Sequence, residues 1–340
     1  MNFLRRTLSY FKPDKSLAAI ASQTAKRILD FSESKCQLRE ENKQLLVIKE
    51  DNNVTRIPFA EIAVVLISHS AVTVSQTVLE NLAEFGAMLT ICNYKHRPVS
   101  MMMPFEHSSI LERLRLQIEV SQPTLKNAWQ QIVKRKIQMQ ANVLMQFYND
   151  NAGLSKMVDR VKSGDPDNVE AQAAKKYWAA LFPELDFHRN PDGHDPLNAR
   201  LNYGYTVLRS MMARAVCASG FHPALGIHHC NQRNAFCLAD DLMEPFRPLV
   251  DWTVRHQFQL SKKPASQKLT RNLTAQVKQQ LIFPLTGRFR ADGENRKLFD
   301  IIAMLAQSLV KFYAKETETL YLPMLERDNS ADDDISPTYQ

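Results

Sequence analysis

Histidine and acidic residues gather in residues 222–251, HPALGIHHCNQRNAFCLADDLMEPFRPLVD. Asp241 and Glu244 are three residues apart, so a helix would place both carboxylates on one face. A preceding histidine, either His228 or His229, would complete a set of ligand types suited to Mg²⁺ or Mn²⁺. If the segment around the two histidines is extended, they point to opposite sides, so only one of them can join a given site.

Each of these residues also has a structural interpretation. A single histidine in a protein core is more often hydrogen-bonded than metal-bound, and acids at the start of a helix complement its dipole. Zinc bound by His229, Cys230 and Cys237 is a further alternative, although these residues lack the paired CxxC spacing of typical zinc sites. The metal site becomes a specific hypothesis only together with a second acidic helix upstream.

A candidate for that second acid is Glu170, in residues 163–182, SGDPDNVEAQAAKKYWAALF. Asp165, followed by proline, predicts the start of a helix. Glu170 shares a broad helical face with two alanines and two aromatic residues, so it should be partly buried and should need a cation or hydrogen-bond donors. The alternative is that Glu170 pairs with Lys175 or Lys176 on a solvated helix.

Two asparagines share a face of the helix predicted for residues 195–216, because Asn198 and Asn202 are four residues apart. They would orient a carboxylate or contact a phosphate. Alternatively, they cap the helix and pack near its start.

Charge is distributed unevenly along the 340 residues, which carry a net charge of +7. Residues 326–340 hold five acids and one base, a net charge of −4, which leaves 42 bases and 31 acids, a net of +11, in residues 1–325. A basic body with an acidic tail indicates a polyanionic partner, most often nucleic acid. Ordinary solubility charge is the alternative.

Cysteine usage and hydropathy bear on the compartment. The five cysteines have no regular spacing, which favours reduced thiols and a cytoplasmic location. No apolar run approaches the length of a membrane span, and the opening MNFLRRTLSYFK lacks the apolar core of a signal peptide.

The elements that must position these residues fall into two unlike regions. Residues 31–104 are rich in strand signals and predict a small β-rich domain, preceded by an extension at residues 1–30 with a helix from Ser16 to Phe31. The expected elements are strands 44–50 and 54–59, which form a hairpin, a buried strand at 62–68, a helix at 76–85, and strands 87–93 and 98–104.

Composition changes at Pro104, and residues 105–325 are predicted to form a larger helical catalytic domain. Residues 326–340 are predicted to be a disordered acidic tail. The predicted fold class is therefore α+β, a small N-terminal β-rich domain followed by a larger all-helical C-terminal domain. Helical spacing is seen at Ile110, Leu114 and Ile118, and again, after Pro123, at Val133, Ile137, Ala141, Leu144 and Tyr148.

Four motifs occur in order in the helical region: EAQAAKKYW, NARLNYGY, ALGIHH and DLMEPFRP. In this order and at these separations, they resemble the Cas1 family of CRISPR spacer integrases. FGAMLTICN in the β-rich region, followed by ERLRLQ and WQQIVKRKIQMQA, is similar to the type II branch. The resemblance covers roughly residues 27–325.

The resemblance implies a homodimer of two-domain subunits, each with a metal site in its helical domain. It implies that Glu170, His229 and Glu244 bind Mg²⁺ or Mn²⁺ and carry the catalysis. Asp241 is a weaker candidate ligand, and Asn202, the asparagine of NYGY, is a supporting residue. Some branches have aspartate where this chain has Glu244, which keeps the ligand type.

The implied activity is that of a metal-dependent DNA endonuclease and integrase in spacer acquisition, the adaptation step of antiviral defence. The 3′-hydroxyl of a short foreign DNA, the protospacer, attacks a phosphodiester of the CRISPR repeat. Implied partners are double-stranded DNA, a small ferredoxin-like subunit that forms a heterohexamer with two dimers, and further type II adaptation proteins. Candidate contacts to the DNA backbone are Arg113, Arg115, Lys134, Arg135, Lys136, Arg209, Arg247, Lys262 and Lys263.

Two other functions are compatible with the same residues. A structure-selective nuclease would cut branched DNA with this site and join nothing. A non-catalytic binding module would use the acids structurally, and Glu170→Ala would then leave strand transfer intact. An assay that separates joining from cutting distinguishes the integrase from the nuclease.

Overall fold

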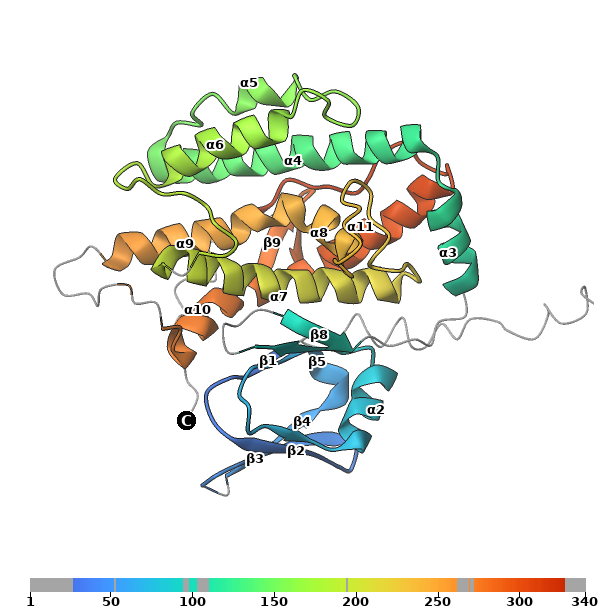
Figure 1. Ribbon diagram of the computed structural model, residues 1–340, viewed down its shortest axis with the longest axis vertical. Coiled ribbons are helices and arrows are strands. Elements are labelled where there is room, and N and C mark those ends of the chain that lie inside the picture. The colour runs from blue at the N-terminus through green and yellow to red at the C-terminus, as the bar shows by residue number, and fades with distance from the viewer. Residues whose placement is uncertain are drawn as a thin grey trace, which may run out of the picture.

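The computed structural model describes residues 27–51, 53–93, 98–102, 110–193, 195–261, 269 and 272–327. A strand-rich N-terminal region is followed by a helical region, so the predicted α+β class is confirmed. In Figure 1 the strand-rich N-terminal region lies below the helical region, and helix α7 (Pro196–Ala218) runs along the boundary between them.

The strand-rich region contains two four-stranded sheets with the strand orders β1-β5-β7-β8 and β4-β3-β2-β6. In the first sheet β1, β5 and β7 are parallel and β8 is antiparallel. The elements of this region are β1 (Arg27–Phe31), β2 (Cys36–Glu41), β3 (Gln44–Lys49), β4 (Val54–Pro58), the 3-10 helix η1 (Phe59–Glu61), β5 (Ile62–Ile67), β6 (Thr73–Val74), α2 (Gln76–Glu84), β7 (Met88–Cys92) and β8 (Pro98–Met102).

Strand β5 is buried on both faces, as its β-branched composition predicts. Val65 packs in the cluster between the two sheets, whereas Val64 and Leu66 pack in the larger cluster that includes the helices. The hydroxyl of Thr90 in β7 lies 3.0 Å from that of Ser210 in α7. Helix α7 therefore packs against the first sheet.

The hairpin expected at residues 44–59 is confirmed as β3 and β4, and the helix expected at 76–85 is confirmed as α2. The helix expected from Ser16 to Phe31 is wrong at its C-terminal end, where Arg27–Phe31 forms strand β1. Strand β1 pairs with β5, which follows it by about thirty-five residues, so a distant partner overrides the local helical pattern.

The sheet therefore begins inside the stretch that was expected to be an N-terminal extension. Residues 1–26 and the expected boundary near residue 105 lie outside the described residues, as do Lys262 and Lys263.

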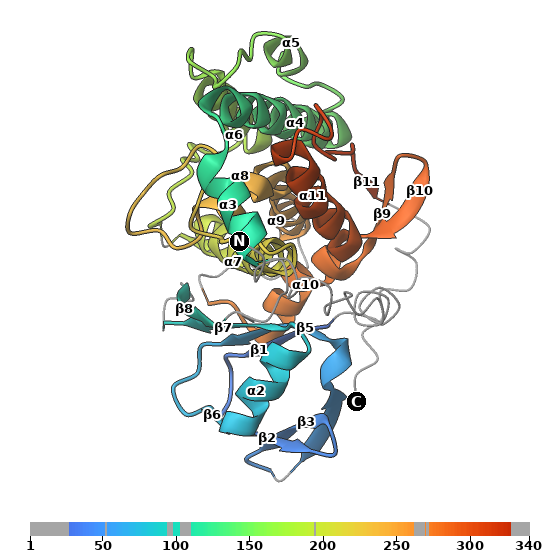
Figure 2. The ribbon, with the colours of Figure 1, turned by 90° about the vertical axis from the view of Figure 1, so that its right-hand side faces the viewer.

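The helical region has α4 and α6 side by side in one layer and α7, α8 and α9 in the next (Figures 1 and 2). The apolar face expected on α4 is buried at Val133, Ile137, Ala141 and Leu144. The helices are α3 (Ile110–Glu119), α4 (Gln122–Tyr148), α5 (Ser155–Val158), α6 (Val169–Leu181), α7, α8 (Cys237–Met243), the 3-10 helix η2 (Glu244–Phe246), α9 (Arg247–Ser261), α10 (Ala275–Thr286) and α11 (Leu298–Tyr313).

Helix α3 is rotated relative to the prediction. Ile118, which was expected on its apolar face, is 67% exposed, and Gln117 is buried instead. The Gln117 amide accepts a bond of 2.6 Å from the His222 amide and donates one of 3.1 Å to the His222 carbonyl. The helix therefore turns a polar side chain inward because the backbone of the neighbouring loop needs partners.

A small sheet interrupts the helical region and corrects the prediction of an all-helical second domain. Strands β9 (Arg288–Ala291) and β10 (Glu294–Lys297) form a hairpin, and β11 (Glu326–Arg327) adds to β9. Residues 326 and 327 form a paired strand, so the prediction of a disordered tail from residue 326 is wrong at these two residues; residues 328–340 lie outside the described part.

Within the described residues, no helix is long and apolar enough to cross a membrane. All five cysteines are described, and none is in a disulfide.

Candidate metal centre

Glu170 lies in the first turn of α6, and the loop before that helix holds its backbone. The carboxylate of Asp165 accepts bonds of 2.9 Å from the amides of both Val169 and Glu170. The Asn168 side chain caps the same turn by accepting from the Ala171 amide. Asp165 therefore holds the first turn of α6, but the predicted start is wrong, because the N-cap is Asn168 and α6 begins at Val169.

Glu244 lies at the break between α8 and α9. Helix α8 ends at Met243 and Glu244 begins η2, with its side chain only 8% exposed. The Nε atom of Arg247, one turn later, lies 2.8 Å from its Oε1. Asp241 and Glu244 were expected to lie on one face of a helix and to act together. Instead, Asp241 contacts the loop that carries His229.

Lys136 connects the two glutamates. Its Nζ atom lies 2.5 Å from Oε1 of Glu170 and 2.6 Å from Oε2 of Glu244, and its side chain is 12% exposed. Helix α4 carries Lys136, and it packs against both α6 and η2. Glu170 thus takes its cation from α4, and Lys175 and Lys176 are exposed. In this structure the ammonium of Lys136 is engaged inside the protein, and its expected contact with the DNA backbone stays a prediction.

Ion pairing keeps this cluster charged despite its burial. Burial acts to lower the pKa of the Lys136 ammonium, but the Glu244 and Glu170 carboxylates outweigh it and raise that pKa. Burial also acts to raise the pKa of Glu244, yet Arg247 and Lys136 hold it at about 2. Glu244 is therefore ionised and can bind a cation.

His229 lies in the loop between α7 and α8, and the carboxylate of Asp241 holds that loop. Asp241 is fully buried and accepts bonds from the amides of Ile227 at 2.6 Å and His228 at 2.8 Å. It also pairs with Nδ1 of His229. A carboxylate only accepts, so Nδ1 carries a proton, and in the neutral imidazole Nε2 then presents its lone pair. This bond raises the pKa of the His229 imidazole, and Glu244 and Glu170 add to the effect.

Gly226 makes this arrangement possible. A Cβ atom at this position would lie 2.3 Å from the His229 carbonyl oxygen and 3.0 Å from Oδ2 of Asp241. Only glycine lets the backbone approach the buried carboxylate so closely.

The neighbouring His228 has a different role. Its ring stacks on Trp129 of α4, with centroids 4.3 Å apart and planes 2° from parallel. The His229 ring meets the same indole edge-on, and the planes of the two histidine rings differ by 86°. The two rings therefore do not point to opposite sides, as an extended segment would place them, because both contact Trp129; His229 is the one whose ring Asp241 orients.

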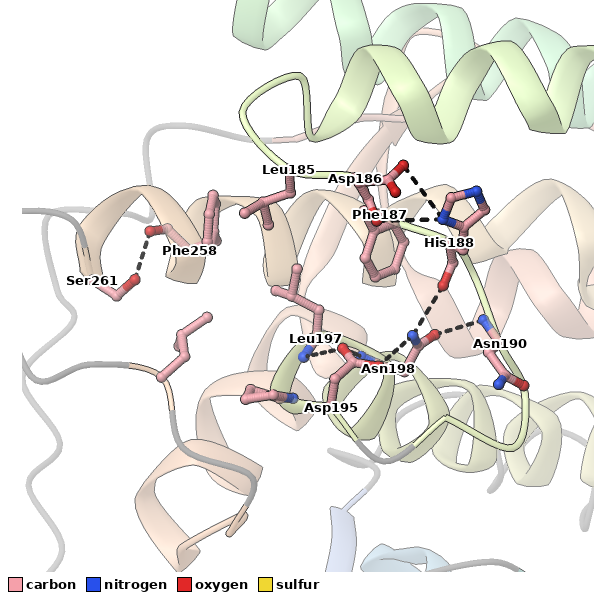
Figure 3. A pocket seen from close by; sticks show the side chains of 12 residues that line it. Leu185, Asp186, Phe187, His188, Asn190, Asp195, Leu197, Asn198, Phe258 and Ser261 are labelled. Atoms are coloured by element: carbon pink, nitrogen blue, oxygen red, sulfur yellow. Dashed lines mark hydrogen bonds and ion pairs between the residues drawn. The ribbon is translucent and has the colours of Figure 1, made fainter.

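Asn198 and Asn202 bind protein groups, which favours their structural interpretation. The guanidinium of Arg189 donates a bond of 2.8 Å to Asn198 and one of 2.7 Å to Asn202. In Figure 3, Asn198 also bonds to the backbone of His188 and Asn190, at the wall of a pocket of about 690 Å³. Glu170, His229 and Glu244 do not line this pocket.

Arg189 and Arg247 both approach the ring of Tyr205, at 5.2 and 4.6 Å from its centroid. Arg247 is thus held by Glu244 and by an aromatic face. Arg209 binds both carboxylate oxygens of Asp240, at 2.6 and 3.0 Å. The expected contacts of both arginines with the DNA backbone stay predictions.

The other described candidates for DNA contact differ in their exposure. Arg115 is exposed, and Arg113 and Lys134 are half-buried. Arg135 borders a polar pocket of about 770 Å³ that also contains Arg290.

The donor set fits a hard divalent cation, but the side chains are arranged around an ammonium. Among the described residues, no group of three histidine, cysteine or acidic side chains is spaced to hold a metal ion, and this includes the zinc alternative at Cys230 and Cys237. Instead, oxygens of Glu170 and Glu244 converge on one cation, that of Lys136. Carboxylates that converge on a cation, next to an oriented imidazole, are suitable ligands for Mg²⁺ or Mn²⁺.

Three contributors to this site were not predicted from the sequence. They are the bridging role of Lys136, the bonds from the loop and the His229 ring to the Asp241 carboxylate, and the close approach of the Gly226 backbone to that carboxylate. A signal existed for the first. Lys136 follows Trp129 and Val133 at the spacing of a buried helical face, and a charge on such a face indicates a partner.

Comparison with known proteins places the chain in a family. Residues 31–274 match the family model described as CRISPR associated protein Cas1. The CRISPR-associated endonuclease Cas1 of Neisseria meningitidis serogroup C (strain 8013) is 37% identical over 276 residues, which cover 80% of this chain and 87% of the relative.

Solved structures share the fold. A casposase bound to integration product has a TM-score of 0.73 at 18% identity, with 90% of this chain and 97% of that chain covered. A Cas6-RT-Cas1–Cas2 complex has a TM-score of 0.70 at 21% identity, with 90% of this chain and 37% of that chain covered. The chain therefore belongs to the CRISPR-associated Cas1 family.

Proposed function

We propose that this protein is a metal-dependent DNA integrase of CRISPR adaptation, with Glu170, Glu244 and His229 as the ligands of its metal. One observation carries the proposal. In a chain of the Cas1 family, two carboxylates from different helices converge on one cation beside a histidine that a buried aspartate orients.

The proposed reaction is a transesterification. The 3′-hydroxyl oxygen of a short donor duplex forms a bond to a phosphorus atom of the CRISPR repeat. The bond from that phosphorus to the repeat's own 3′-oxygen breaks, and this oxygen leaves and takes up a proton. One phosphodiester replaces another, so the step needs no ATP. A divalent cation bound to these residues supplies charge neutralisation at the phosphate and helps the hydroxyl lose its proton.

The residues divide the work of holding that cation. Glu170 and Glu244 supply the anionic oxygens, while Arg247 fixes one oxygen of Glu244 in place. His229 supplies Nε2, because Asp241 occupies Nδ1. The basic excess of the body of the chain supplies affinity for the DNA backbone without choosing a sequence.

Partners follow from the relatives. One structure of similar fold is a complex of Cas1 with Cas2, and we propose that this chain likewise assembles as a homodimer with a small ferredoxin-like subunit into a heterohexamer. Further type II adaptation proteins, and a cytoplasmic location, belong to the same proposal.

A structure-selective endonuclease is the second candidate, because the Neisseria relative is named an endonuclease. The experiment that separates the two supplies a supercoiled plasmid carrying a repeat, short duplex donor DNA, the small partner subunit and Mn²⁺. Joined donor establishes the integrase, whereas cut plasmid without joined donor establishes the nuclease.

His229→Ala and His228→Ala form a matched pair for this assay. Each variant removes one of two neighbouring histidine side chains, but only the side chain of His229 bonds to Asp241, whereas that of His228 stacks on Trp129. We expect His229→Ala to abolish joining and His228→Ala to retain most of it. Equal joining by wild type and His229→Ala would place the site elsewhere.

A further inference from the structure

The ammonium of Lys136 occupies the position between the two glutamates. Its distances of 2.5 and 2.6 Å to Glu170 and Glu244 are those of close ion pairs. A divalent cation held by Glu170 and Glu244 would use the same oxygen lone pairs, at bond lengths of about 2.1 Å. The ammonium and the metal ion therefore compete for one place.

Charge makes this competition strong. The two carboxylates are already matched by two cations, Lys136 and Arg247. A divalent ion that entered while both cations stayed would face two like charges at short range in a poorly solvated site.

The two cations differ in how firmly they are held. The Nε atom of Arg247 lies 2.8 Å from Oε1 of Glu244, and its planar guanidinium also lies over the Tyr205 ring, so it is held on two sides. Lys136 pairs with both glutamates, but its ammonium is a compact charge at the end of a flexible four-carbon stem. The flexible lysine, rather than the stacked arginine, is the one that can leave.

From this geometry we propose that Lys136 is a resident counter-cation, a positioning residue that keeps Glu170 and Glu244 together and is displaced when a divalent metal ion binds. The inference rests on the proposed metal centre and adds a regulation to it. Lys136 sets the affinity of the site for metal, because every metal ion that binds must first break two ion pairs.

The test is a titration of the full chain with Mn²⁺, followed through the electron paramagnetic resonance signal of the free ion. Lys136→Met removes the competing charge and keeps most of the side-chain volume. Lys134→Met is the matched control, a lysine on the same helix that the metal ligands do not contact. We expect Lys136→Met to bind Mn²⁺ about tenfold more tightly than wild type, a typical size for coupling between ligands, and Lys134→Met to match wild type.

Glu170→Gln in each background separates failure of this inference from failure of the metal centre. If binding depends on Glu170 but Lys136→Met binds Mn²⁺ no more tightly than wild type, the proposed role of Lys136 is wrong, whereas the proposed metal centre is supported. If no background shows Mn²⁺ binding that depends on Glu170, both are overturned.

A second measurement applies if Lys136→Met fails to fold. Reductive methylation of the wild-type chain, read by mass spectrometry, reports the accessibility of each lysine amine. We expect saturating Mn²⁺ to increase the modification of Lys136 several-fold and to leave Lys134 unchanged. Equal protection of Lys136 with and without Mn²⁺ would show that it is not displaced.

Discussion

Asp241 holds His229 at two points, the ring Nδ1 and the backbone amide. The same buried carboxylate accepts from the two preceding amides, so one side chain sets both the path of the loop and the orientation of the imidazole. An acid that looks like a metal ligand from its spacing thus acts through the histidine.

Asp241→Asn should weaken Mn²⁺ binding by roughly 10- to 100-fold, the range for partners that orient a ligating histidine. The amide can donate to Nδ1, which moves the imidazole proton to Nε2 and removes the ligating lone pair. Calorimetric titration with Mn²⁺ measures this. Asp240→Asn is the control, since Asp240 contacts Arg209 and Asn234. Equal affinity in Asp241→Asn and wild type would contradict the role given to Asp241.

Gly226→Ala should destabilise the protein by about 1–3 kcal/mol, as overpacking does elsewhere, and should reduce donor joining. The new methyl group would meet the carbonyl oxygen of His229 and the carboxylate of Asp241. Gly287→Ala is the control, because the nearest atom to a Cβ there lies at 3.4 Å. Urea unfolding of both variants gives the comparison, and a Gly226→Ala protein with wild-type stability and joining would show that the loop can relax.

Asp165→Ala should reduce stability by about 0.5–2 kcal/mol, the usual effect of losing a helix cap. It should also reduce joining, because Asp165 binds the amide of Glu170. Asp167→Ala removes an exposed carboxylate that pairs with Lys162, so little change is expected there. Thermal unfolding and the integration assay measure the two effects. If the two variants behave alike, the capping contact does not position Glu170.

Asp251 should make stability depend on pH. Burial raises the pKa of its carboxyl to about 7, although bonds from Tyr205 and Tyr177 act in the opposite direction. An unfolded aspartate has a pKa of about 3.9. Between these values the folded chain keeps a proton that the unfolded chain releases, so the free energy of unfolding falls as the pH rises from about 4 to about 7.

Asp251→Asn has no proton to lose and should show a flatter profile over the same range. Urea unfolding at several pH values measures the difference between wild type and variant, which should change steadily with pH. Asp186→Asn, at a side chain that is 98% exposed, is the control. Parallel profiles for wild type and Asp251→Asn would mean that Asp251 is ionised in the folded protein.

Local patterns predicted the parts of the fold that local physics determines. The β-branched run of β5 and the apolar face of α4 are signals of this kind, and both are confirmed. The β9–β10 hairpin was missed although its turn carries a recognisable signal, Asp292-Gly293, with both residues at positive φ.

Contacts between distant segments could not be predicted from spacing. Lys136 meets Glu170 and Glu244 only because α4 packs between α6 and η2, so its role depends on the tertiary fold. The choice of the glutamates and His229 as ligands came from the order of motifs, and it stays a prediction.

The most direct test of the account is to locate Mn²⁺ by anomalous X-ray scattering in crystals of the full chain. We predict one peak within bonding distance of the Glu170 and Glu244 carboxylates and of Nε2 of His229, with the ammonium of Lys136 moved away. A manganese peak at other residues, with Lys136 still bridging Glu170 and Glu244, would contradict the account.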